Sequence, residues 1–220
     1  MDRTQQPVRQ AIFHAAEHLF AELGYDQTSV QLIADMAGVP VEAVGEEFGG
    51  KKRLYLEIMD NLREEGEKSF SRVIANYTPD AAGVHYLIDS TLDHFLRRPQ
   101  DAGLWMQRRL QDAADLTEVE WQGSRPQFVR TLELTKSAFR PELDPGLILQ
   151  EIFWSVHNFV RGGFLDEAGR SIGPEDPETV DRFRRHLHRT VDLFVREPET
   201  GEGLERQPSS RWGWPGATAP

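Results

Sequence analysis

The chain has 220 residues, 39% of them hydrophobic, which is enough for one medium domain or a small domain joined to a larger one. A net charge of −11 excludes broad attraction to nucleic acid or anionic membranes, so any DNA contact must be local. The lack of cysteine excludes disulfides, thiolate zinc sites and cysteine nucleophiles. Because neither a membrane span nor a signal-peptide core is visible, we expect a cytoplasmic protein without membrane partners.

The first fifty residues have the pattern of three helices. From Pro7 to Leu23, apolar residues recur at three- and four-residue steps, which predicts an amphipathic helix. Thr28 or Ser29 is expected to cap a short second helix that runs through Ala37, and a third spans about 40–48. Two short helices joined by a glycine-containing turn, behind a longer one, predict a trihelical helix-turn-helix unit.

The remaining sequence predicts a larger helical body. Two Asp-Pro pairs, Asp144-Pro145 and Asp176-Pro177, place a capping carboxylate before a proline at the first helical position. We expect helices over about 54–77, 80–96, 100–114, 119–139 with a break or kink at Pro126, 145–168 and 177–196. No alternating strand pattern of useful length is present, so the predicted class is all-α.

The last 24 residues, 197–220, change to glycine, proline, serine and charge without periodicity. This composition predicts a flexible tail. Trp212 and Trp214 lie within it, and we favour loose contact with the surface, or disorder, over a docking motif because two isolated aromatics bury little area.

The N-terminal residues resemble the DNA-binding domain of TetR-family transcriptional regulators. The positions that match in order and spacing are Arg9, Ile12, Ala15-Ala16, Leu19-Phe20, Gly24-Tyr25, Thr28-Ser29-Val30, Ile33-Ala34, Ala37-Gly38-Val39, Phe48, Lys51 and Leu54. The resemblance implies about nine helices per chain. It also implies a helix-turn-helix domain over 1–53, a helical ligand-binding and dimerisation domain over 54–196, and a homodimer whose small-molecule pocket controls two DNA-binding heads.

In that family the third helix enters the major groove. By resemblance, the expected DNA-binding residues are Thr28, Ser29, Gln31, Val41, Glu42, Ala43, Glu46, Lys51 and Lys52. Two contact positions depart from the family pattern. Gly45 replaces a tyrosine that usually reaches phosphate, and Glu47 stands where a histidine or another aromatic or basic residue is common.

The predicted helix-turn-helix domain, called the head below, is acidic. Three interpretations of the acids on its third helix stay open. Residues 1–50 hold two basic and eight acidic side chains, before Lys51, Lys52 and Arg53. In the first interpretation, the negative charge of Glu42 in the first turn stabilises the helix through its dipole. In the second, either Glu42 or Glu46 accepts a hydrogen bond from cytosine N4. Alternatively the acids repel DNA. The three cations at 51–53 are the best phosphate contacts, or a solvated charge run.

Aromatic residues concentrate in the larger body. Residues predicted to line a ligand pocket are Trp105, Trp121, Phe128, Trp154, His157 and Arg161. Aromatics at helical spacing are more often core than pocket. His157 and Arg161, one turn apart, could orient an acidic ligand group, or they are simply hydrogen-bonded within an interface.

Two apolar helices near the end of the body are expected to form a four-helix dimer interface. The helix after Pro145 is apolar on more than one side, so it requires two partners. The predicted interface residues are Ile152, Val156, Phe159, Phe183, Leu187, Val191 and Phe194.

No enzyme or cofactor motif is present in the sequence. No histidine has an acid three residues before it, as di-iron bundles require, and phosphate loops and nucleophile elbows are missing. His14 and His18 have metal-like spacing but no third ligand, so we predict surface histidines and no metal site.

The sequence therefore supports two functional hypotheses. The first is a TetR-like repressor that binds operator DNA as a homodimer and is released by a small hydrophobic or aromatic effector. The second is a ligand- or protein-binding module on the same fold that no longer binds DNA.

Overall fold

A computed structural model describes residues 5–116 and 124–196. Over these ranges it contains nine helices and one short hairpin: α1 (Gln5–Leu23), α2 (Val30–Ala37), α3 (Glu42–Phe48), α4 (Lys51–Asn76), α5 (Ala81–Arg97), α6 (Pro99–Arg109), α8 (Ser124–Thr135), α9 (Pro145–Gly162), β1 (Phe164–Leu165), β2 (Ser171–Ile172) and α10 (Pro177–Asp192). The all-α prediction is confirmed. Trp121, Trp212, Trp214 and the expected tail lie outside the described residues.

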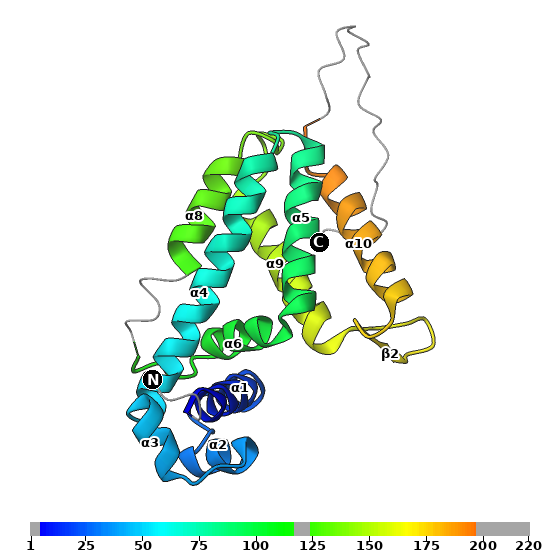
Figure 1. Ribbon diagram of the computed structural model, residues 1–220. Coiled ribbons are helices and arrows are strands. Elements are labelled where there is room, and N and C mark those ends of the chain that lie inside the picture. The colour runs from blue at the N-terminus through cyan, green and yellow to red at the C-terminus, as the bar shows by residue number, and fades with distance from the viewer. Residues whose placement is uncertain (1–4, 117–123, 197–220) are drawn as a thin grey trace, which may run out of the picture.

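The helices are arranged as a small head beneath a larger body. In Figure 1, α1, α2 and α3 form the lower end, and α4 runs from this head up into the body beside α5 and α8. Helix α6 crosses between the two parts, with α9 and α10 completing the body. The boundary predicted at residue 53 therefore falls in the first turn of a continuous helix, α4.

Side-chain caps fix several helix starts where the sequence placed them. Ser29, rather than Thr28, caps α2, because its hydroxyl oxygen accepts a hydrogen bond from the Leu32 amide. The Asp144 carboxylate accepts from two amides of the first turn of α9, and Asp176 does the same for α10. Both helices begin with the proline that follows the aspartate.

Four predicted helices, α6, α8, α9 and α10, end earlier than expected. Helix α6 stops at Arg109, since Gln111 and Ala113 adopt positive φ angles of 69° and 53° that no helix contains. Helix α8 stops at Thr135, and Phe139 instead forms an isolated antiparallel bridge with Val195. The same bridge takes the chain after Asp192 out of the predicted final helix.

One short pair of strands interrupts the helical body. Helix α9 ends at Gly162 instead of continuing to residue 168, and the next segment forms the two-residue pair β1–β2. Gly163 makes this possible, because its φ is +65° and a Cβ there would lie 2.1 Å from the Ile172 carbonyl oxygen. Strands of two residues are too short for an alternating pattern to reveal them.

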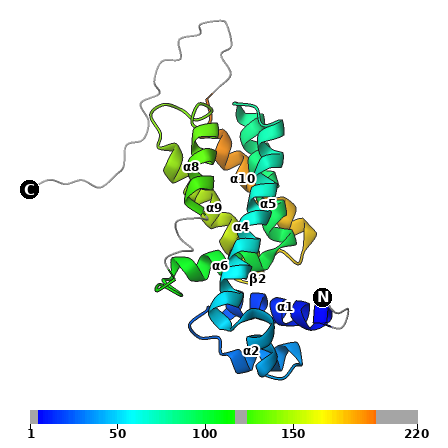
Figure 2. The same cartoon turned by 60° about the vertical axis from the view of Figure 1, so that its left-hand side comes forward.

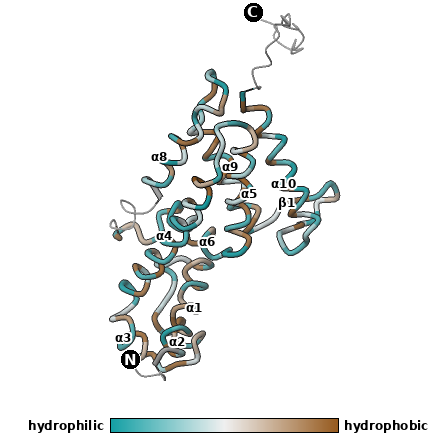
Figure 3. Tube along the Cα trace, turned by 45° about the horizontal axis from the view of Figure 1, so that its top comes forward, coloured by the Kyte–Doolittle hydropathy of each residue, from teal (hydrophilic) through white to brown (hydrophobic). Residues whose placement is uncertain are grey.

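The chain buries two hydrophobic clusters, one in the head and one in the body. The head cluster joins α1–α4 to three residues from α6 and the turn after it, namely Leu104, Ala113 and Leu116. The body cluster is built mainly on α5, α9 and α10. Figure 3 shows apolar and polar residues interspersed along the helices, as expected of amphipathic elements. No helix in the described ranges is long and apolar enough to cross a membrane.

Close backbone packing holds α6 against α1. A Cβ added to Gly103 would lie 2.8 Å from the carbonyl oxygen of Ala21 and 2.9 Å from its Cβ. These distances leave no room for a side chain, so glycine at 103 allows the two helices to approach this closely.

A reciprocal set of hydrogen bonds strengthens the same junction. The Asp112 carboxylate, in the turn after α6, accepts from the amides of Tyr25 and Asp26 at 2.7 and 2.9 Å. The Asp26 carboxylate in turn accepts from the Ala113 amide at 3.3 Å. The loop that leads into the helix-turn-helix is thus bonded to the loop that ends α6.

Gly103→Ala should destabilise the chain by about 1–3 kcal/mol, because a methyl group at this site forces α6 away from α1. Denaturant unfolding measures the change. Gly45→Ala is the matched control, since nothing lies within 4 Å of a Cβ there and alanine is the better helix former by up to about 1 kcal/mol. Equal effects of the two substitutions would contradict the tight α1–α6 contact.

Candidate functional site

The helix-turn-helix lies at the free end of the head. Figures 1 and 2 both place α2 at the end of the molecule away from the upper ends of α4, α5 and α8. Val44 and Phe48 of α3 are buried in the head cluster, which turns the opposite side of α3 to solvent. Gly38 ends α2 in the left-handed conformation, with φ of 68°, and begins the turn to α3.

Most of the residues expected to contact DNA are accessible. Ser29, Gln31, Glu42, Glu46 and Lys52 are exposed, and Val41, Ala43 and Lys51 are partly exposed. Thr28 differs, because only 1% of it is exposed and its hydroxyl donates to the Gly24 carbonyl at 2.6 Å. Thr28 therefore holds the loop before α2, and its side chain has no surface to offer a phosphate.

Two of the head's cations are used internally. The Lys51 ammonium donates to the carbonyls of Tyr25 and Thr28, both at 2.9 Å, and lies 4.1 Å from the centre of the Tyr25 ring. These bonds tie the start of α4 to the loop before α2. Lys51 thus has a structural role that its neighbour Lys52, which is exposed, does not have.

Arg9 of α1 is also used internally, because it bonds residues of α3 and α4. Its guanidinium donates to both carboxylate oxygens of Glu57, at 2.7 and 2.6 Å, and to the Glu47 carbonyl. It also lies 3.9 Å from the centre of the Phe48 ring. Within the described head, Lys52 and Arg53 are consequently the cations left to face DNA from the start of α4, beside the exposed acids of α3.

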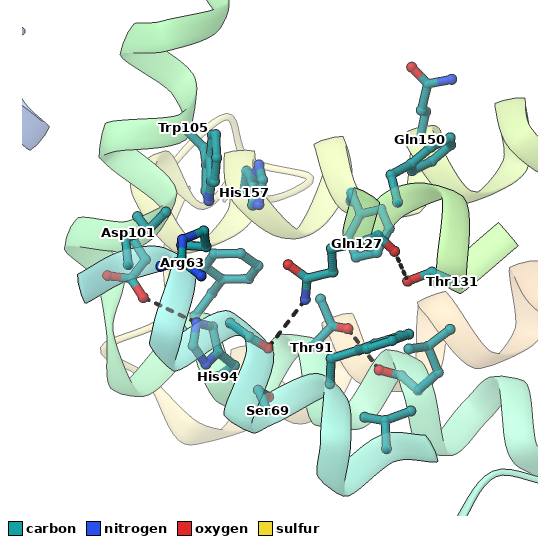
Figure 4. Close-up of a pocket in the computed structure, with 18 of the residues that line it drawn as sticks. Arg63, Ser69, Thr91, His94, Asp101, Trp105, Gln127, Thr131, Gln150 and His157 are labelled. Carbon is teal, nitrogen blue, oxygen red and sulfur yellow. Dashed lines mark hydrogen bonds and ion pairs between the residues drawn. The ribbon is translucent and has the colours of Figure 1, made fainter. Parts of the chain in front are cut away.

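The body contains a cavity of about 520 Å³, a size that suits a small organic molecule. Helices α4, α5, α6, α8 and α9 all contribute side chains to its wall. Figure 4 shows side chains from these helices converging. Its apolar and aromatic lining includes Leu62, Phe70, Val73, Leu87, Phe95, Trp105, Phe128, Phe153 and Trp154.

Four of the six residues predicted for a pocket line this cavity: Trp105, Phe128, Trp154 and His157. Trp121 lies outside the described residues. Arg161 is not part of the wall, because its guanidinium pairs with Glu22 of α1 at 2.7 Å. The walls from α4 and α5 were not predicted, since their apolar stripes have the same spacing as ordinary core.

His157 is a buried polar group in this wall. Only 8% of it is exposed, and neither ring nitrogen has a hydrogen-bond partner in the described parts of the chain. Its ring meets the edge of Phe95, with centroids 4.4 Å apart. Burial lowers the pKa of His157 to about 4, and the positive charges of Arg109 and His94 act in the same direction. The imidazole is therefore neutral near pH 7.

Asp101 connects the cavity to the head. It is 1% exposed, and its Oδ2 accepts from Arg98 Nε at 2.8 Å and lies 3.1 Å from His94 Nε2. Figure 4 shows the His94–Asp101 pair beside Arg63 and Trp105. Arg98 also reaches Asn61 of α4 and Glu17 of α1, at 3.1 and 3.4 Å. One arginine thus joins a cavity residue to the first helix.

The tetR family of bacterial regulatory proteins matches residues 12–58, which span the helix-turn-helix just described. The N-terminal domain belongs to the TetR family. No curated protein matches the sequence of the chain significantly.

Solved structures with the same fold cover most of the chain. The ketosteroid transcriptional regulator KstR2 of Mycobacterium tuberculosis is 19% identical over 86% of this chain and 95% of that one, with a TM-score of 0.64. A TetR-like transcriptional regulator from Rhodococcus sp. RHA1 (17%, 84% and 96%, 0.59) and the fatty acid degradation regulator FadR from Bacillus halodurans (19%, 83% and 95%, 0.56) are also similar. The described chain therefore has the TetR fold.

The residues predicted for a TetR-type dimer interface lie in the interior of the chain. Six of them are buried within the chain, and the seventh, Phe194, is partly buried against the same cluster: Ile152, Val156, Phe159, Phe183, Leu187, Val191 and Phe194. They form part of the chain's own hydrophobic core. An apolar stripe indicates that a face is buried, but it does not distinguish the chain's own core from a partner.

The predicted surface histidines of the TetR-type head are exposed, and His14 lies 3.7 Å from Glu17. No group of three or more metal-ligating side chains is formed among the residues whose positions are described.

Stability of this TetR-type chain should fall between pH 6.5 and about 4 through His157. The unfolded state takes up a proton near pH 6.5 while the native imidazole, with a pKa of about 4, does not. Each pH unit in this window then removes about 1.4 kcal/mol. Urea unfolding at several pH values should show a shallower slope for His157→Gln than for the parent, and the parent slope for His18→Gln, which alters an exposed histidine. Identical slopes for all three would contradict a buried neutral ring.

Proposed function

We propose that the chain is a ligand-responsive TetR-type repressor that leaves its operator when a small hydrophobic or aromatic molecule fills the cavity. The observation that carries this proposal is that α4 and α6 both line the cavity and both hold the head. A molecule that displaces either helix must therefore also displace the helix-turn-helix.

Helix α4 contributes residues to both the head cluster and the cavity wall. Its first turns place Leu54, Tyr55 and Ile58 in the head cluster, and its middle places Leu62 and Phe70 in the cavity wall. Since the helix is continuous from Lys51 to Asn76, a tilt imposed at the cavity moves its first turn.

Helix α6 provides a second mechanical link. Trp105 lines the cavity and packs against both hydrophobic clusters, while Gly103 touches α1. The Asp112–Asp26 hydrogen bonds then join the end of α6 to the loop before α2. A shift of α6 consequently reaches the DNA-binding unit without crossing flexible chain.

The apolar wall favours a hydrophobic effector. The cavity is lined mainly by aromatic and aliphatic side chains, and burying each apolar Å² of a ligand contributes about 25 cal/mol. Two of the similar structures are named for ketosteroids and for fatty acid degradation, both of which involve apolar molecules.

For operator binding we propose contacts from the exposed side of the helix-turn-helix and the start of α4. These are Ser29, Gln31, Val41, Glu42, Ala43, Glu46, Lys52 and Arg53. We do not include Lys51 among the DNA contacts and assign it a structural role, because its ammonium already donates to two carbonyls. Glutamates on α3 suit cytosine N4, which donates a hydrogen bond in the major groove.

We also propose a homodimer that pairs the outward sides of α9 and α10. The inward sides are filled by the chain's own core, whereas Leu147, Glu151, Ser155 and Asn158 recur along one exposed side of α9. Two heads are needed to occupy two half-sites about 34 Å apart.

Light scattering that finds the mass of a single chain, 25.1 kDa, under DNA-binding conditions would contradict the dimer.

Lys52→Ala should weaken binding to the DNA upstream of the chain's own coding sequence several-fold and lower the salt slope by about one unit, because one phosphate contact is lost. Fluorescence anisotropy at low and moderate salt measures both. Lys136→Ala removes an exposed lysine from the turn after α8, in the body, and should leave binding unchanged. Lack of binding to any fragment at low salt would instead favour a module that does not bind DNA.

N-phenyl-1-naphthylamine, an uncharged apolar fluorescent dye, should bind the cavity and weaken DNA binding. Thr91→Trp places a large ring in the cavity and should abolish dye binding. Thr190→Trp is the matched control, because both threonines donate to the carbonyl four residues earlier but Thr190 lies on α10, away from the cavity. Dye titration followed by DNA anisotropy provides the measurement, and a bound dye with no effect on DNA affinity would contradict the ligand response.

A further inference from the structure

The unpaired imidazole of His157 defines a polar point in an apolar wall. The ring is more than nine-tenths buried, and both of its nitrogens lack partners among the described residues. An unpaired buried polar group costs stability, and such groups are typical of sites that a ligand or an ordered water completes. Because His157 lines the cavity, the cavity's ligand is the natural partner.

The surroundings of His157 determine which ligand group suits it. The ring lies beside Phe95 on α5. Burial, together with the electrostatic effect of Arg109 on α6 and His94 on α5, disfavours a positive charge on the ring. A neutral imidazole presents one N–H donor and one bare nitrogen acceptor.

A hydroxyl group matches this imidazole better than the alternatives. It can donate to the bare nitrogen or accept from the N–H, so it pairs with either side of the ring in either tautomer. A carboxylate can only accept, and it would bury its charge next to an uncharged ring. The pairing of His157 with Arg161 that would have favoured an acid is missing, because Arg161 pairs with Glu22 instead.

The charged residues of the cavity wall are already paired or lie toward solvent. Asp101 Oδ2 is paired with Arg98 at 2.8 Å and contacts His94 at 3.1 Å, while its Oδ1 has no hydrogen-bond partner among the described residues. Arg63 lies 3.7 Å from Asp60, and Arg109 is exposed and stacks over the Trp154 ring at 4.8 Å. The buried part of the wall thus offers His157 as an uncharged hydrogen-bonding group among aromatic rings.

We infer that the effector of this cavity is an uncharged, largely apolar molecule that carries a hydroxyl, and that this hydroxyl pairs with His157. The inference rests on the proposed ligand response for its biological meaning, but the recognition itself is a property of the cavity. Phe95, Trp105 and Phe153 surround the apolar part of such a molecule.

Three probes that share one apolar body test the inference: 4-hexylphenol, hexylbenzene and 4-hexylbenzoate. Binding to the full chain is followed by quenching of tryptophan fluorescence and by calorimetry at pH 7.5. One hydrogen bond to a buried partner is worth about tenfold in affinity, so 4-hexylphenol should bind about tenfold more tightly than hexylbenzene and more tightly than the benzoate.

Two variants at the same position separate recognition from packing. His157→Phe removes both ring nitrogens while keeping a ring, and it should bring the phenol and the hydrocarbon to similar affinity with hexylbenzene binding unchanged. His157→Gln keeps a donor and an acceptor and should preserve a preference for the phenol. A ring with a purely structural role would change the affinities of all three probes together.

The outcomes distinguish this inference from the proposed function. Equal binding of phenol and hydrocarbon by the parent, preference for the benzoate, or binding of the naphthylamine dye but of none of the three probes would each overturn the inference, even if DNA is still released. A phenol preference that His157→Phe removes supports it, even if DNA affinity does not respond.

Discussion

The contact between α6 and α1 is the constraint on which the remaining architecture depends. At Gly103 the two helices approach to a distance that excludes any side chain, and the Asp112 and Asp26 carboxylates bond the adjoining loops in both directions. A head fixed in this way cannot move independently of α6. Because α6 also carries Trp105 and Asp101 into the cavity wall, cavity and head belong to one mechanical unit.

Local chemistry accounts for what the sequence predicted about the fold. Capping side chains at Ser29, Asp144 and Asp176 act within three residues, so the starts of α2, α9 and α10 were visible in the sequence. The ends of α6, α8, α9 and α10 were placed too late, because they depend on distant partners, such as the bridge between Phe139 and Val195. Periodicity reports that a helical face is buried, and it says nothing of where the chain leaves the helix.

The same distinction applies to the site. Aromatic composition predicted that Trp105, Phe128, Trp154 and His157 line a pocket, and all four lie in the cavity wall. Charged residues were harder to assign, because their partners lie far away in the sequence. Lys51 bonds carbonyls more than twenty residues earlier, and Arg161 pairs with a glutamate in the first helix. Sequence spacing could not indicate that these cations were already engaged.

The internal use of Arg9 and Lys51 has a consequence for how such a regulator would search a chromosome. Most proteins of this kind gain background affinity from cations that face any phosphate. Here two cations hold the head together, and acids on α3 line its outer side. Random sequence would then retain few molecules, so a larger share of a small cellular pool stays free to reach the operator. Selectivity would come from weak attachment elsewhere as much as from strong attachment at the right place.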